Sequence, residues 1–119
     1  MKKLFIVLAL TAGACGKPLP TLEGIDLKQW KDDKNGCDHY REKTLDILTP
    51  QFDKLKALDE TQISQLLGKP DQTELYQRNQ KFYTYFMEPS AKCDSSHKKI
   101  KKLVIRFNGT RVAKEVALE

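Results

Sequence analysis

The fold is decided by residues 58–87, LDETQISQLLGKPDQTELYQRNQKFYTYFM, in which a helical pattern gives way to an alternating one. Asp59 and Gln62 are spaced as a capping pair at the start of a helix. Gly68 and Pro70 are typical of a helix end. Three apolar residues at helical spacing form the predicted buried stripe of this helix: Ile63, Leu66 and Leu67. We therefore expect a short amphipathic helix directly before the first strand.

Beyond Asp71 the pattern alternates, and aromatic and β-branched residues become frequent. The sequence predicts four strands, over residues 73–77, 81–87, 103–107 and 111–118. The first two are joined around residues 78–80. The last two are joined around Asn108 and Gly109, a pair typical of a tight hairpin turn in which both residues have positive φ. Consecutive hairpins of this kind predict a meander of antiparallel strands.

Upstream of this stretch the sequence predicts further helices. Asp26 with Gln29 is typical of a helix start, and Asn35-Gly36 of a stop. Apolar residues then follow at spacings of three and four, as on one face of a helix: Tyr40, Leu45, Leu48, Phe52 and Leu55. Pro50 requires either a kink or a new helix. The predicted fold class is therefore α+β, with N-terminal helices packed on one face of a four-stranded antiparallel meander sheet, in a single domain over residues 25–119.

The N-terminus, MKKLFIVLALTAGAC, is typical of a secretory signal: two lysines, an apolar run and small residues before a cysteine. It resembles a bacterial lipoprotein signal, so we expect cleavage of residues 1–14 and triacylation of Cys15. Residues 15–24 would form the lipidated cysteine and a proline-containing tether. An ordinary secretory signal cut nearby is the alternative. Gly16 is similar to the residue that follows the lipidated cysteine in lipoproteins sent to the outer membrane, where the domain would face the periplasm.

Two further cysteines, Cys37 and Cys93, form an even pair in an oxidising compartment, which favours a disulfide. His39 and His97 lie close to them in the sequence, so a zinc site is an alternative, as are free thiols. A Cys-x-His pair is cramped for tetrahedral zinc. We expect the disulfide and no metal.

Little in the sequence indicates catalysis. The serines lack the setting of a nucleophile elbow, and there is no glycine-rich phosphate loop. The net charge of +5 includes two lysines of the predicted signal peptide, and an exported lipoprotein does not meet nucleic acid. We expect no enzyme, no cofactor and no nucleic-acid partner.

A partner surface is predicted on the sheet. In the segment 82–86 neighbouring side chains point to opposite faces, so Tyr83 and Tyr85 can point outward while Phe82 and Phe86 pack on the helices. Arg106 would share the outer face. Tyrosine and arginine are frequent at binding hot spots. The alternative, equally favoured by the pattern, places both tyrosines in the core.

Residues 58–112 resemble the SmpA/OmlA domain of small outer-membrane lipoproteins, whose best-known member is an accessory subunit of the β-barrel assembly machinery. The resemblance rests on Leu-Leu-Gly-x-Pro at Leu66 to Pro70 and on the closing strand, LVIRFNGTRV, with these residues carrying it: Gln62, Ile63, Leu66, Leu67, Gly68, Pro70, Tyr85, Leu103, Phe107 and Asn108. It implies a fold like that of the β-lactamase-inhibitor protein. The family does not typically carry the Cys37 and Cys93 pair.

Two functions follow as hypotheses. The first is a membrane-anchored, non-catalytic protein-interaction module with an envelope protein as partner, in outer-membrane assembly or maintenance. The second is an inhibitor or ligand-binding lipoprotein on the same scaffold, which captures a hydrolase or a cell-wall fragment.

Overall fold

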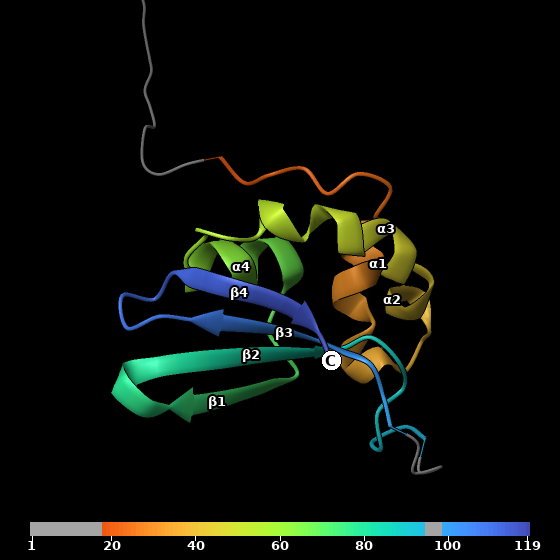
Figure 1. The fold of residues 1–119 in the computed structure, drawn as a ribbon. Helices are drawn as coiled ribbons and strands as arrows, with labels where there is room; N and C mark the ends of the chain where they lie inside the picture. The colour runs from red at the N-terminus through yellow and green to blue at the C-terminus, as the bar shows by residue number, and fades with distance from the viewer. Residues whose placement is uncertain (1–17, 95–98) are drawn as a thin grey trace, which may run out of the picture.

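The computed structural model describes residues 18–94 and 99–119, which fold as helices followed by a sheet (Figure 1). The predicted signal peptide and Cys15 lie outside the described residues, as does His97. The helices and 3-10 turns precede the sheet, apart from a turn within its first hairpin, and have these bounds: α1 Leu27–Asp32, η1 Lys34–Gly36, α2 Tyr40–Lys43, α3 Leu45–Leu48, η2 Thr49–Lys54, α4 Glu60–Leu67 and η3 Gln77–Asn79.

Capping residues fix the starts of α1 and α4, as the sequence predicts. The Asp26 carboxylate accepts hydrogen bonds from the backbone N–H groups of Lys28 and Gln29. Asp59 and Gln62 form a reciprocal capping box, in which each side chain accepts from the backbone N–H of the other residue. Gly68 ends α4 with a φ of 84°, a conformation that suits glycine. Both helix starts are therefore encoded locally.

The apolar stripe after Tyr40 is divided among three short elements. The Thr44 hydroxyl donates to the Arg41 carbonyl oxygen at 2.7 Å, at the junction of α2 and α3. Pro50 lies in the first turn of the 3-10 segment η2. A new segment does start here, as one of the two outcomes predicted, but it begins at Thr49 with Leu48 as N-cap, so Pro50 is its second residue and not its first.

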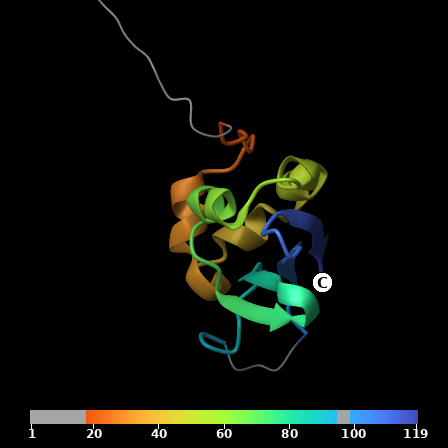
Figure 2. The same cartoon turned by 90° about the vertical axis from the view of Figure 1, so that its left-hand side faces the viewer.

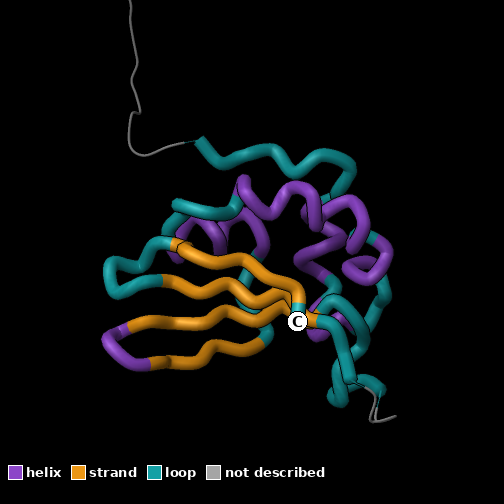
Figure 3. Tube along the Cα trace, in the orientation of Figure 1, coloured by secondary structure: helices purple, strands orange, loops and turns teal. Residues whose placement is uncertain are grey.

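The sheet has the strand order β1-β2-β3-β4, with every neighbouring pair antiparallel. Its strands are β1 Gln72–Tyr76, β2 Gln80–Phe86, β3 Lys102–Phe107 and β4 Ala113–Leu118. Figures 1 and 3 show the meander, and Figure 2, turned by 90°, shows the helices on one side of it. The α+β fold class, with helices on one face of a four-stranded meander, is confirmed.

The prediction for the Asn108-Gly109 turn is wrong in its detail. In the part of the chain that the structure describes, neither residue has positive φ, and the left-handed conformation falls on Arg111 (φ 68°). Asn108 bonds to both Arg111 and Val112 through the backbone, and its side chain accepts from Thr110 and Val112. The Asn108 side chain thus stabilises a longer loop with a bulge, which a tight two-residue turn would not allow. Two consecutive residues with positive φ occur instead in the first hairpin, at Arg78 and Asn79.

The core lies between the helices and the inner face of the sheet. Its fully buried members come from both layers: Trp30, Leu48, Leu55, Ile63, Leu67, Tyr85, Leu103, Ile105 and Phe107. The buried stripe predicted for α4 at Ile63, Leu66 and Leu67 is confirmed. The helices lie on this side of the sheet (Figure 2), and on the opposite face Thr84, Val104 and Phe86 are also buried.

Candidate functional site

Tyr83 and Tyr85 lie in the core, so their predicted place on a partner surface is wrong. Tyr85 is fully buried, packs on Trp30 with ring centroids 5.2 Å apart, and donates its hydroxyl to the Gly68 carbonyl oxygen at 2.8 Å. Tyr83 packs edge-on against Phe107 and donates to the Glu60 carboxylate at 3.1 Å. Burial raises the pKa of both phenols above their ordinary value. Both tyrosines therefore have structural contacts on the helix side.

The register of β2 against β3 explains this orientation. Tyr83 pairs with Ile105 and Tyr85 with Leu103, so both tyrosines share the face of the strongly apolar side chains of β3. Phe82 pairs instead with Arg106. The segment 82–86 is apolar on both faces, so its own pattern does not determine which face is buried. The alternation of Leu103, Ile105 and Phe107 is the signal that would have done so.

Arg106 lies on the outer face, as predicted, but with different neighbours. Its Nε donates to Glu115 at 2.7 Å and its Nη1 to Gln80 at 3.2 Å. The guanidinium lowers the pKa of the Glu115 carboxyl. On the same face the rings of Tyr76 and Phe82 meet edge to face with centroids 5.7 Å apart. The outer face thus combines aromatic surface with an ion pair.

Strand β1 forms a free edge of the sheet, and each of its five residues is exposed. Leu75 is 77% exposed and Tyr76 is 58% exposed, the two largest values among the exposed large apolar residues of the described chain. The side chain of Leu75 points to the helix side, because Leu75 pairs with Lys81, whose ammonium reaches Glu60 of α4. The sequence analysis missed this edge, since only its position in the sheet makes it distinctive.

A buried ion pair joins the helices to the sheet. Arg41 donates to Asp71 at 2.7 Å, and the two side chains are 1% and 4% exposed. The Arg41 Nε donates to the Trp30 carbonyl oxygen at 2.9 Å, and the guanidinium lies over the Trp30 ring at 4.3 Å. Asp71 also accepts from the backbone N–H groups of Asn35 and Phe86.

The sequence carries a signal for the burial of this arginine. Arg41 stands four residues before Leu45 and seven before Leu48, on the predicted buried stripe. A charged residue at such a position requires a buried partner. The network contains no nucleophile at its centre and has the features of a structural junction.

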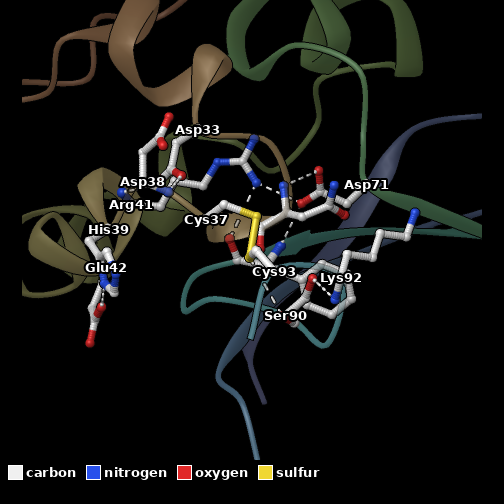
Figure 4. The surroundings of a disulfide bond; sticks show 12 residues. Asp33, Cys37, Asp38, His39, Arg41, Glu42, Asp71, Ser90, Lys92 and Cys93 are labelled. Carbon is white, nitrogen blue, oxygen red and sulfur yellow. Dashed lines mark hydrogen bonds and ion pairs between the residues drawn. A yellow bond between two sulfur atoms is a disulfide. The ribbon is translucent and has the colours of Figure 1, made fainter. Parts of the chain in front are cut away.

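The disulfide predicted between Cys37 and Cys93 is confirmed, with Cα atoms 5.7 Å apart (Figure 4). It ties the turn after η1 to the loop after β2. His39 is exposed and pairs with Glu42 at 2.9 Å, pointing away from the sulfur atoms in Figure 4. Among residues 18–94 and 99–119, no group of three His, Cys, Asp or Glu side chains has the arrangement of a metal site.

Within the same two ranges, no helix is long and apolar enough to cross a bilayer. No protein-family profile, curated protein or solved structure matches the chain. The resemblance of residues 58–112 to the SmpA/OmlA domain, and the likeness to the β-lactamase-inhibitor protein that it implies, stay predictions from the sequence.

Proposed function

We propose that the chain is the precursor of a bacterial envelope lipoprotein whose folded domain is a non-catalytic protein-interaction module. Cys15 would carry the lipid anchor, at the outer membrane and facing the periplasm. Pro18 and Pro20 lie between the anchor and the folded domain, which already includes Leu22, because that side chain is buried in the core. Anchoring then requires nothing from the folded domain, whose surface is left for a partner.

The observation that carries the proposal is the free edge at β1. Exposed edge strands are templates for pairing with another chain, and proteins usually blunt them with lysine, proline or a bulge. Strand β1 reads QTELY, with one charged residue, Glu74, but neither lysine nor proline, and its pairing with β2 has no register shift. Exposed apolar side chains stand on both of its faces, Leu75 on one and Tyr76 on the other.

An extended segment of an envelope protein fits this edge. It would add a strand beside β1 by backbone hydrogen bonds, and alternate side chains would contact Leu75 on one face and Tyr76 on the other. Phe82 and Arg106 continue the contact area across the outer face. The resemblance at residues 58–112 supports outer-membrane assembly or maintenance as the process in which this partner takes part.

Photo-crosslinking in intact envelopes tests the proposal. A photoreactive amino acid in place of Tyr76 should give one dominant crosslinked protein, whereas the same probe in place of the exposed Lys43 on α2 should not. Equal crosslinking at both positions, or none at Tyr76, would refute the interaction surface.

The anchor has its own test. Mass spectrometry of the membrane fraction should find a triacylated N-terminus at Cys15, and Cys15→Ser should release the protein from the membrane. An unmodified chain that starts elsewhere would contradict the lipoprotein assignment, as would a Cys15→Ser variant that stays membrane-bound.

A further inference from the structure

A pocket of about 460 Å³ lies where the end of α1, η1, the link from α4 to β1 and the loop after β2 meet. This pocket is independent of the β1 edge described above. Basic side chains from all four segments line it, together with an amide and two carboxylates: Lys31, Lys34, Lys69, Lys92, Asn35, Asp32 and Asp71.

The positive charge of this pocket is not neutralised by the aspartates that line it. Neither of the two aspartates that line the pocket forms its ion pair with one of the four lysines. The two acidic residues of the pocket are already paired, Asp32 with Lys28 at 3.0 Å and Asp71 with the buried Arg41 at 2.7 Å. The lysines of the pocket therefore outnumber its aspartates four to two, and this excess of positive charge would attract an anionic group.

The walls of the pocket are bonded to one another. The Asn35 N–H donates to Asp71 Oδ1 at 3.0 Å, and the Ser90 N–H donates to the Asn35 carbonyl oxygen at 3.0 Å. The Cys37–Cys93 disulfide closes the same junction, and Figure 4 shows Lys92 beside it, on the side where Asp71 lies. The backbone around the lysines is thus held in place before any ligand binds, which lowers the entropy cost of binding.

Gly68 shapes the rim. A side chain here would meet the Lys31 methylenes at 3.0 Å, and the φ of 84° is itself unfavourable for other residues. The glycine therefore lets the stem of Lys31 lie against the turn after α4. This contact brings the Lys31 side chain to the pocket.

We propose that this pocket binds a phosphate monoester or diphosphate group. Such a group carries about two negative charges and several acceptor oxygens, which suits a pocket lined by four lysines, and lysine is a frequent phosphate ligand. A space of this size holds the phosphate and a small organic group attached to it. The two sources of this chemistry in an envelope are a soluble phosphorylated compound and the headgroup of an anionic lipid.

Titration calorimetry of the folded domain with inorganic pyrophosphate tests the proposal. Lys34→Gln with Lys69→Gln should weaken binding roughly tenfold, since each exposed charge pair contributes up to about a factor of five. The matched control, Lys43→Gln with Lys114→Gln, removes the same charge from exposed lysines elsewhere and should change affinity less than about twofold. Equal weakening in both variants would show non-specific attraction to a basic protein, and no binding by the unsubstituted domain would overturn the proposal outright.

Vesicles distinguish the two sources. The unsubstituted domain without its anchor should bind phosphatidylcholine vesicles that contain phosphatidic acid, and lose this binding in the Lys34/Lys69 variant, if the ligand is a lipid headgroup. Pyrophosphate binding with no binding to these vesicles assigns the pocket to a soluble ligand. Either result supports a phosphate site, whereas vesicle binding that both double variants retain would contradict it.

Discussion

Tyr85 is a central residue of the core, with both a ring contact and a hydrogen bond to the helix side. Its ring contacts Trp30 and its hydroxyl bonds to the Gly68 carbonyl oxygen. We expect Tyr85→Ala to lower the free energy of unfolding by about 3–5 kcal/mol, as for other buried aromatic residues. Tyr85→Phe should cost about 1 kcal/mol, because only a hydrogen bond is lost. Urea unfolding measures both, and Tyr76→Ala should stay within about 0.5 kcal/mol because that side chain is exposed.

The same tyrosine makes stability sensitive to alkali. Its pKa is raised by burial, whereas in the unfolded chain it titrates near 10.0. Above that pH the unfolded state loses the proton and the folded state keeps it, so stability is complete below pH 10 and falls as pH rises. Tyr85→Phe should show a shallower fall in unfolding free energy between about pH 9 and 11 than the exposed Tyr76→Phe control. Identical slopes would show that Tyr85 titrates normally.

The buried Arg41–Asp71 ion pair is the second feature whose loss we expect to lower the free energy of unfolding strongly. Removing one member of a buried pair leaves the other charged and without its partner, at a cost of about 3–5 kcal/mol. We expect this loss for Arg41→Met, whereas Lys28→Met, which breaks the exposed pair with Asp32, should cost about 1 kcal/mol or less. Similar losses in the two variants would mean that the buried pair contributes no more than a surface one.

At the scale of elements, features that depend on residues close in the sequence were predicted correctly more often than features that depend on distant residues. The helix start at Asp59 was predictable because its capping partner, Gln62, is three residues away. The faces of β2 were not, because they depend on the register against β3, some twenty residues further on. The Asn108 turn was misread because the side chain of Asn108 bonds back to Thr110 and Val112 and so favours a longer loop.

The candidate sites also divide into one that could be predicted from the sequence and two that depend on the folded chain. The disulfide was predicted from cysteine count and compartment, which require no geometry. The β1 edge and the lysine pocket were not predicted, because each depends on segments that meet only in the folded chain. Lys31 and Lys92, for example, are ordinary surface residues in the sequence and line one pocket in the structure.

The Cys37–Cys93 disulfide joins two separate elements, and its contribution to stability can be measured. It joins residues 56 positions apart, and a bond of this kind typically contributes about 2–4 kcal/mol. Cys37→Ser with Cys93→Ser should lower the unfolding free energy by about that amount. A reductant should then have no effect on the double variant while it destabilises the unsubstituted domain. A reductant effect of equal size on both would assign the sensitivity to something other than this bond.

At the scale of the whole molecule, the architecture is one-sided. The helices cover one face of the meander (Figures 1 and 2), and the β1 edge is exposed, whereas Thr84, Val104 and Phe86 on the opposite face are buried. Side chains on the helix side determine stability, and the exposed side chains of β1 are available for binding. Substitutions on the two sides should therefore separate these properties.

Partner recovery from crosslinked envelopes tests this separation most directly. With the photoreactive amino acid placed at the exposed Thr73 of β1 instead of Tyr76, Tyr76→Ala with Arg106→Ala should abolish recovery of the crosslinked partner, while the melting temperature changes little. Loss of an interface anchor costs about 2 kcal/mol or more. Thr61→Ala with Gln65→Ala, exposed on α4, should retain both the partner and the melting temperature. Undiminished partner recovery by the Tyr76/Arg106 variant, with a fold as stable as before, would contradict the account.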